Sequence, residues 1–394
     1  VAAGYAGAAG ACAAPLAAAA DGEEGRLAGE APDATDDAKY FCEYAYLYHQ
    51  LDMLEDTHRT GSYFQAVISN PGSFRDKVVL DVGAGTAILS IFAARAGATR
   101  VFAVEATDMA VRARALVKAN GLADVVTVIQ GTVETVTLPC KVDVIVSEWM
   151  GYFLLRESML DSVLTARDRF LKPSGLMFPS HATLFLAPVV PCKALSDKAK
   201  AWAQEETHWD GFQEHMQESY ETDFACLRGE FLAEQRKYYL QTGAFVHLQP
   251  TGLIGAARPL LEMNLAEVSL AELKDPREPL RCSMRIVRDG AVAGFCGYFD
   301  TPFRGGEGDP VENPVTLTTA PTVGQSTHWG QQIFGFYPPL QAKRGDVLDC
   351  IMFIRRQEKN HRLLWLDSEF ELSELGPTGE RVVKDRRREH YYVD

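Results

Sequence analysis

The chain has 394 residues, of which 47% are hydrophobic and 23% charged, a composition typical of a soluble globular protein with room for two domains. Its formal charge of −14 argues against direct nucleic-acid binding and favours basic partners. No run approaches the roughly 18 apolar residues needed to cross a bilayer, so neither a membrane span nor a membrane partner is expected.

The eight cysteines are scattered along the chain and form no Cys-x-x-Cys pair. This spacing argues against a structural zinc site, and no metal is expected. Scattered thiols suit a reducing compartment, so the cytoplasm, the nucleus or both are predicted as the location.

Residues 1–35 form an Ala/Gly-rich tail that cannot build a packed core and is expected to be disordered. The tail lacks the basic region of a secretory signal. From about residue 36, large apolar side chains recur every three or four residues, at Tyr40, Tyr44, Leu47 and Leu51. This spacing predicts an amphipathic helix with an aromatic face.

Strands and helices then alternate up to residue 179. Apolar β-branched runs predict strands at Lys77–Val82, Arg100–Val104, Val125–Gln130 and Val142–Val146. Helices are predicted at Ala87–Ala96 and Met109–Asn120, each followed by Gly. This alternation indicates a parallel, doubly wound sheet.

The pattern changes after residue 179, where an antiparallel β domain is predicted over residues 180–394. Short strands are expected at Ala182–Leu186, Ser283–Arg288, Val347–Ile354 and Arg362–Leu366. Residues 193–238 read as an inserted helical arm. The many aromatic side chains of this arm indicate a packing or oligomer surface.

A glycine-rich turn follows the first predicted strand directly, in the sequence VVLDVGAGTA at 78–87. Gly83 and Gly85 allow a ligand to approach the backbone closely. Glu105 ends the next strand, about twenty residues downstream, where a carboxylate can accept hydrogen bonds from both ribose hydroxyls. The turn alone fits many nucleotide-binding proteins.

Asp81 favours S-adenosylmethionine over NAD, because a carboxylate inside the strand would repel a pyrophosphate but can serve the amino group of a methionine moiety. Glu134 follows a later strand, where it can meet the adenine amine. The plainer alternatives are a turn-capping role for Asp81, a solvated strand end at Glu105 and a surface carboxylate at Glu134.

Two further carboxylates, Glu148 and Glu157, follow the strand Val142–Val146 on one predicted loop. The carboxyl ends of such strands border the ligand crevice of an open α/β sheet. A guanidinium is always charged and offers a planar fork of donors, which two carboxylates can hold by charge-assisted bonds. They can also draw its charge away from the nitrogen that attacks a methyl donor. The alternative is a pair of capping or surface acids.

At these residues the chain resembles the protein arginine methyltransferase family, over residues 36–394. The segment SEWMGY at 147–152, with Glu157, resembles the double-glutamate loop of the family. YFCEY at 40–44 resembles its N-terminal aromatic helix, which folds over the cofactor, and THW at 327–329 resembles a loop that the barrel contributes to the active site. The segments VEAT at 104–107, FLLRES at 153–158 and THWGQQ at 327–332 resemble most a plant class numbered ten.

The resemblance implies a Rossmann-like S-adenosylmethionine-binding domain at 36–179, then an antiparallel β-barrel substrate domain at 180–394, with a dimerisation arm at 193–238. It implies a ring-shaped homodimer and type I activity, which gives ω-monomethyl- and asymmetric ω-dimethylarginine. Arginine-rich substrates such as histone tails and Gly/Arg-rich proteins are implied at the level of the family.

Carried over by position, the resemblance assigns roles to single residues. Glu148 and Glu157 would bind and activate the substrate guanidinium. His328 would face Asp56, as a proton acceptor or a structural latch. The cofactor would be contacted by Gln50, Arg59 (at the methionine carboxylate), Asp81, Gly83, Gly85, Glu105 (at the ribose) and Glu134 (at the adenine). Tyr44, Met53 and Met159 would shape the substrate pocket, with the two methionines favouring the asymmetric product.

Taken singly, these residues also fit plainer roles. The methionines suit an ordinary core, His328 beside Trp329 suits a packing role, and Arg59 suits a surface ion pair. The joint occurrence of all of them in this order favours the family. Ala87 departs from the family, whose turn usually carries a third glycine there. The extra methyl is expected to weaken cofactor affinity without abolishing binding.

Three other functions compete. The first is a methyltransferase acting on a small amine or guanidine compound, and the second is a scaffold that binds arginine-rich tails without turnover. The third, NAD-dependent oxidoreduction, ranks last because of Asp81. The ligand that raises the melting temperature (adenosylhomocysteine, NAD or neither) discriminates among them.

Overall fold

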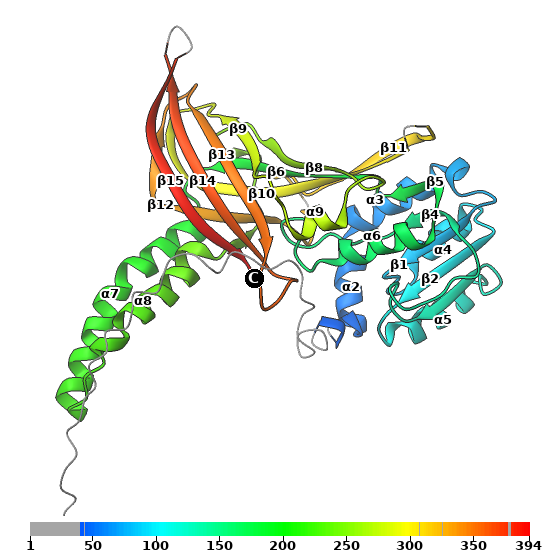
Figure 1. Ribbon diagram of the computed structural model, residues 1–394, viewed down its shortest axis with the longest axis horizontal. Helices are drawn as coiled ribbons and strands as arrows, with labels where there is room; N and C mark the ends of the chain where they lie inside the picture. Colours follow the sequence, from blue (N-terminus) through cyan, green and yellow to red (C-terminus); the bar gives the residue numbers. More distant parts are fainter. Residues whose placement is uncertain (1–39, 43, 307, 325, 377–379) are drawn as a thin grey trace, which may run out of the picture.

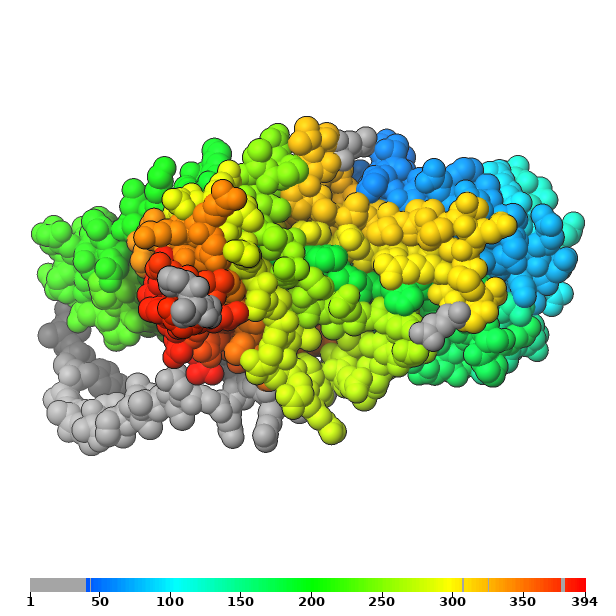
Figure 2. Space-filling view, turned by 90° about the horizontal axis from the view of Figure 1, so that it is seen from above, coloured from blue at the N-terminus to red at the C-terminus, as the bar shows by residue number. Residues whose placement is uncertain are grey.

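The computed structural model describes residues 40–394, except 43, 307, 325 and 377–379. The tail of residues 1–35 and the start of the predicted first helix lie outside the described residues. Figure 1 shows two units side by side, with a helical arm that extends from the second. Figure 2 shows the same arrangement from above, with the β domain between the arm and the N-terminal unit.

The N-terminal unit is a parallel sheet with helices around it, as the sequence predicts. Two helices, α2 (Leu47–Glu55) and α3 (Thr57–Ile68), precede the sheet. The remaining elements are β1 (Val78–Val82), α4 (Ile88–Arg95), β2 (Arg100–Glu105), α5 (Met109–Ala119), β3 (Val126–Gln130), β4 (Val142–Val146), α6 (Met159–Phe170) and β5 (Leu171–Phe178). The strand order is β3-β2-β1-β4-β5, and every pairing is parallel.

Strand register brings the functional segments to one edge of this sheet. Asp81 on β1 lies opposite Ala103 on β2 and Val146 on β4. The glycine turn after β1, Glu105 at the end of β2 and the loop after β4 therefore emerge together. This edge is the ligand crevice of an open α/β sheet.

The second unit consists of two antiparallel sheets, as predicted. One sheet has the order β7-β12-β10-β6-β8, with β11 paired to β10, and the other has the order β15-β14-β13-β9. The strands of the first sheet are β6 (His181–Val189), β7 (Ala244–Val246), β8 (Arg258–Asn264), β10 (Gly290–Gly305), β11 (Pro310–Thr318) and β12 (Gln331–Ala342). Those of the second are β9 (Leu280–Arg285), β13 (Val347–Arg356), β14 (Leu364–Leu375) and β15 (Arg381–Val393), and a short helix, α9 (Leu270–Lys274), precedes β9.

Aromatic side chains join the two sheets in one core. Phe295 stacks on Phe334 of the same sheet, with ring centroids 5.0 Å apart. It also contacts Phe370 and Tyr391 of the other sheet, at 4.9 and 5.4 Å. The β10–β11 pair reaches back to the N-terminal unit, where Asn313 N–H donates to Asn70 Oδ1 at 2.7 Å. The second unit is thereby fixed against the first.

The inserted arm consists of α7 (Lys193–Tyr220) and α8 (Arg228–Arg236), followed by a π-helical turn at Lys237–Gln241. Trp209 is 7% exposed and contacts Phe212 and Phe231 at 5.3 and 4.7 Å. These aromatic side chains therefore form the arm's own core. Tyr220 and Tyr238 remain largely exposed on its surface. Within the described residues, no helix has the length and apolar character needed to cross a membrane.

Several predicted element bounds were wrong. The first helix is interrupted at Ala45 and Tyr46, and Leu47 and Leu51 are exposed instead of forming a buried face. The strand predicted at Arg362–Leu366 begins at Leu364, so Arg362 lies in the preceding turn. The strand predicted at Ser283–Arg288 is β9, which ends at Arg285.

Candidate active site

The glycine turn after β1 forms one wall of the predicted cofactor site, called the cradle below. Other side chains already contact this turn. Gly83 and Gly85 have φ angles of +69° and +53°. A Cβ atom at Gly83 would lie 2.6 Å from Met159 Cε, and one at Gly85 would lie 2.7 Å from Gln50 Oε1. Gln50 and Met159 therefore lie against the turn.

Glu105 is held beside this turn by hydrogen bonds to both oxygens. Gly85 N–H donates to Oε2 at 2.8 Å. Thr107 donates to Oε1 through its N–H at 2.8 Å and its hydroxyl at 2.7 Å. The carboxylate is therefore fixed in direction at the end of β2, and Thr107 is a supporting residue that the sequence analysis did not identify.

Asp81 is fully buried, and its two oxygens differ. Oδ2 accepts from Ser90 N–H at 3.0 Å and from the Ser90 hydroxyl at 2.6 Å, which caps the start of α4. Oδ1 is buried without a hydrogen-bond partner. Burial raises the pKa of Asp81 to about 7, with Glu105 adding to the rise and the Ser90 bonds opposing it. The capping alternative thus accounts for only one of the two oxygens.

Glu134, another residue predicted at the cofactor, is exposed, and its Oε1 accepts from the Ser162 hydroxyl at 2.7 Å. It lies in the turn after β3. The cradle as a whole fits S-adenosylmethionine. Two glycines allow close backbone approach, Glu105 supplies a carboxylate for a ribose, and Asp81 Oδ1 is a buried acceptor for an ammonium group.

Ala87 keeps the conformation of the glycine it replaces. Its φ and ψ are 66° and 26°, in the left-handed region, and its methyl group is fully buried. Relieving that conformation in Ala87→Gly gains about 1–2 kcal/mol. The lost methyl burial and the freer unfolded chain cost about 1 kcal/mol and 0.4–1 kcal/mol.

Ala87→Gly is therefore expected to change the free energy of unfolding by less than about 1 kcal/mol and to leave cofactor affinity within roughly threefold. Ala87→Val, which is β-branched, is expected to destabilise by more than about 2 kcal/mol. Urea unfolding and calorimetry with adenosylhomocysteine measure both. A larger gain in affinity in Ala87→Gly would support the expectation from the sequence that the alanine methyl weakens binding by more than this, whereas an unchanged affinity would contradict that expectation.

Glu148 forms a forked ion pair with Arg59. Nε and Nη2 of Arg59 donate to Glu148 Oε2 at 2.9 and 2.6 Å, and Glu148 Oε1 accepts from Met150 N–H at 3.2 Å. The side chains of Arg59 and Glu148 are 12% and 11% exposed. Nη1 of Arg59 donates to the carbonyl of Met53 at 3.1 Å. Arg59 thus contacts Glu148 here, whereas the resemblance assigns it to a methionine carboxylate.

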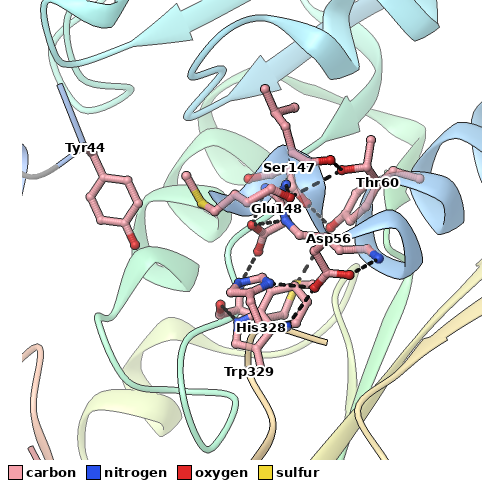
Figure 3. A network of polar contacts seen from close by, with 12 residues as sticks. Tyr44, Asp56, Thr60, Ser147, Glu148, His328 and Trp329 are labelled. Carbon is pink, nitrogen blue, oxygen red and sulfur yellow. Dashed lines mark hydrogen bonds and ion pairs between the residues drawn. The ribbon is translucent and has the colours of Figure 1, made fainter. Parts of the chain in front are cut away.

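Figure 3 shows Glu148 within a polar network that reaches His328 of the β domain. His328 Nδ1 lies 2.7 Å from Asp56 Oδ2, and the same oxygen accepts from His328 N–H at 2.9 Å. Asp56 Oδ1 accepts from Arg59 N–H at 2.9 Å, which caps α3. Burial alone would raise the pKa of Asp56, but the hydrogen bonds from His328 and Arg59 lower it to about 2. The carboxylate therefore stays ionised opposite the imidazole.

Glu157 lies in a second cluster, with the N-terminal aromatic segment. The Tyr44 hydroxyl donates to Glu157 Oε2 at 2.7 Å, and Arg156 Nη1 lies 3.5 Å from Oε1. In Figure 3 Tyr44 stands apart from the Glu148 network. Burial raises the pKa of Glu157, and Glu148 adds to the rise, whereas the bond from Tyr44 and the charge of Arg156 oppose it. The two glutamates thus influence each other electrostatically from one loop.

Comparison with known proteins places this architecture in one class. Residues 180–374 match the arginine methyltransferase oligomerization subdomain, and residues 57–179 match the ribosomal protein L11 methyltransferase family. A methyltransferase sheet followed by that subdomain defines an arginine methyltransferase.

Protein arginine N-methyltransferase PRMT10 of Arabidopsis thaliana is 44% identical over 91% of this chain and 92% of its own length. PRMT10 of Oryza sativa subsp. japonica is 45% identical over 86% and 89%. The chain therefore belongs to the protein arginine N-methyltransferase family, which uses S-adenosylmethionine as the methyl donor.

Solved structures agree with this assignment. The crystal structure of the Arabidopsis thaliana protein arginine methyltransferase 10, described as uniquely open, has a TM-score of 0.85 and 42% identity, over 90% of this chain and 100% of that one. A Trypanosoma brucei PRMT1 enzyme–prozyme heterotetramer with AdoHcy has a TM-score of 0.73 and 30% identity, over 89% and 100%.

Proposed function

We propose that this arginine methyltransferase is a type I enzyme. It forms ω-monomethyl- and asymmetric ω-dimethylarginine in arginine-rich proteins such as histones and Gly/Arg-rich proteins. The observation that supports this most is the pair Glu148 and Glu157. Both carboxylates come from the loop between β4 and α6, beside the turn that holds the cofactor.

Glu148 already binds a guanidinium, because two nitrogens of Arg59 donate to its Oε2 atom. Two contacts in the pair are long, since Glu148 Oε1 accepts from Met150 N–H at 3.2 Å and Glu157 Oε1 lies 3.5 Å from Arg156 Nη1. A substrate guanidinium between these oxygens would replace both contacts with charge-assisted hydrogen bonds. Its positive charge would then concentrate on the two bound nitrogens.

The third nitrogen is thereby left as the nucleophile, and S-adenosylmethionine supplies an electrophilic methyl group. The proton released from that nitrogen needs an acceptor. The raised pKa of Glu157 suits it to that role. His328, which is held by the ionised Asp56, is the second candidate for the proton acceptor. If it does not accept the proton, its role is to hold the two units together.

The asymmetric product is supported by the place of Met159. Its Cε would collide with a Cβ at Gly83, so the thioether lies against the glycine turn, and Met159 itself directly follows the loop that carries the two glutamates. Met53 lies on α2, one turn before Asp56. Side chains of this size would restrict the orientation of a monomethylated guanidinium and favour a second transfer to the same nitrogen.

Incubation with methyl-labelled S-adenosylmethionine tests the acceptor. A histone tail and a small guanidine compound are offered in parallel. Label in the peptide alone supports the proposal. Label in the small compound alone favours the first alternative. A melting-temperature rise with adenosylhomocysteine but no labelled acceptor favours a binding scaffold without turnover.

Asp81 predicts a pH dependence of cofactor binding. Its pKa of about 7 means that it is largely protonated at about pH 5.5 and mostly ionised at about pH 7.5. Only the ionised form pairs with the ammonium group of the cofactor. The affinity for adenosylhomocysteine is therefore expected to rise by up to roughly 25-fold over this interval. Calorimetry on the wild type and Asp81→Asn measures it, and an equal rise in the variant would contradict the assignment.

The assembly and location are also proposals. The oligomerization subdomain and the exposed Tyr220 and Tyr238 of the arm support a homodimer. The net charge of −14 supports basic protein substrates. The cysteines of the described residues are free thiols, which supports the cytoplasm, the nucleus or both. A histone substrate would make the protein a chromatin regulator.

A further inference from the structure

The loop that carries Glu157 has a strained backbone. Phe153, Leu154, Glu157 and Ser158 all have positive φ angles, of 53°, 67°, 79° and 58°. A residue with a side chain loses about 1 kcal/mol or more in this region, and such conformations persist only where surrounding contacts enforce them. The carboxylate of Glu157 therefore depends on whatever holds this backbone.

The contacts that hold it come from the β domain, in the turn between β13 and β14. Glu157 N–H donates to the carbonyl of Arg362 at 2.6 Å, and Arg362 Nη1 donates to the carbonyl of Glu157 at 3.1 Å. The neighbouring Ser158 hydroxyl donates to the carbonyl of His361 at 2.5 Å. Both main-chain groups of Glu157 are thus bound by the single residue Arg362.

The same guanidinium lies on the N-terminal aromatic segment. Arg362 Cζ is 3.8 Å from the centroid of the Tyr40 ring and 5.6 Å from that of Phe41. Tyr40 packs on Tyr44, with centroids 4.9 Å apart, and Tyr44 donates to the Glu157 carboxylate. One side chain therefore links the β domain, the glutamate loop and the segment that covers it.

Hydrogen bonds within the turn between β13 and β14 also hold the main chain around Arg362. Leu363 N–H donates to the carbonyl of Asn360 at 3.0 Å, and Gln357 N–H donates to the carbonyl of Leu363 at 2.9 Å. Arg362 N–H donates to Asn360 Oδ1 at 3.0 Å. The main chain at Arg362 is therefore fixed before a substrate binds, which is the condition for precise positioning.

We propose that Arg362 is a positioning residue for methyl transfer, which sets the direction of the Glu157 carboxylate and packs Tyr40 and Tyr44 over it. This inference rests on the proposed role of Glu157. Arg362 binds the main-chain N–H and carbonyl of Glu157, so we expect it to act through that residue and not on the substrate.

Arg362→Ala tests this directly. Its kcat for methyl transfer to an arginine-rich peptide is expected to fall by about tenfold or more, because the Glu157 loop loses its orientation. Arg362→Lys keeps a cation over Tyr40 but not the planar fork, so an intermediate kcat is expected. Arg288→Ala is the matched control, since its guanidinium also donates to main-chain carbonyls, those of Thr251 and Leu253. Its kcat is expected to stay within twofold.

Two readouts separate positioning from a structural role. Tyr40→Leu removes the contact between Tyr40 and Arg362 by changing the other partner. The effects of Tyr40→Leu and Arg362→Ala on kcat are therefore expected to be non-additive. The rate of amide hydrogen exchange is expected to rise in residues 153–158 of Arg362→Ala but not in β13 or β14. This measurement needs no substrate. Additive effects, unchanged exchange or a wild-type kcat in Arg362→Ala would overturn the proposal.

Glu157→Gln distinguishes this failure from a failure of the proposed mechanism. If Glu157→Gln is inactive while Arg362→Ala is fully active, Glu157 keeps its role and only the inference about Arg362 is lost. If Glu157→Gln retains full activity, the role of Glu157 itself is wrong, and the inference about Arg362 falls with it.

Discussion

Replacement of Glu148 by Gln is expected to lower methyl transfer to an arginine-rich peptide by at least about a hundredfold. The amide can neither balance the charge of a guanidinium nor accept two of its donors equally. The guanidinium of Arg59 would also lose the carboxylate to which it donates. The measurement is the initial rate with methyl-labelled S-adenosylmethionine at saturating cofactor.

The controls for Glu148→Gln address folding and charge. Asp168→Asn removes a carboxylate that is also paired with an arginine, Arg167, but is 60% exposed, and near wild-type activity is expected. A rise in melting temperature with adenosylhomocysteine would show that Glu148→Gln keeps its cofactor cradle. A folded Glu148→Gln with more than a tenth of wild-type activity would remove Glu148 from the mechanism.

Removal of the arm, residues 193–238, is expected to leave a monomer with little activity. The arm belongs to the matched oligomerization subdomain and exposes Tyr220 and Tyr238. On the N-terminal unit, apolar side chains are exposed around α2, at Tyr46, Leu47, Tyr48 and Leu51. A homodimer would cover such surfaces and order α2, which carries Gln50 and Met53. Light scattering and the transfer rate, measured together, test this.

The shorter deletion of residues 199–236 controls for local damage. Ala194 and Leu195 pack on the β domain, and Lys198 Nζ donates to the carbonyl of Thr242 at 2.6 Å. These contacts survive in the shorter deletion, which is still expected to be monomeric. A stable monomer with full turnover would show that the arm is not required for activity.

Local pattern was enough to predict the N-terminal sheet. The apolar strand at Val142–Val146 and the glycine turn at 83–85 have the bounds and placement that the sequence indicates. Asp81, Gly83 and Glu105 meet there because parallel strands align their carboxyl ends, a rule that needs no tertiary information. The fold class and the cofactor were predictable for that reason.

The supporting contacts were not predictable in the same way. Ser90 and Thr107 bind nearby carboxylates through local hydrogen bonds that many Ser and Thr residues make in helices and turns. Nothing in the sequence therefore distinguishes these two residues. The sequence predicts Arg362 at the start of a strand, because an Arg beside alternating apolar residues is typical of a strand end, but the strand begins at Leu364. Its contact with Glu157 joins residues far apart in sequence. β10 is not among the predicted strands, since Gly294 and Gly297 interrupt its alternation.

The product of the reaction tests the central claim most directly. Purified protein is incubated with methyl-labelled S-adenosylmethionine and an arginine-rich histone tail, and the methylarginines are identified after hydrolysis. We expect ω-monomethylarginine first and asymmetric ω-dimethylarginine at longer times, with almost none of either from Glu148→Gln. Symmetric dimethylarginine would contradict the type I assignment, and the absence of methylarginine from a protein that binds adenosylhomocysteine would contradict arginine methylation of this substrate class.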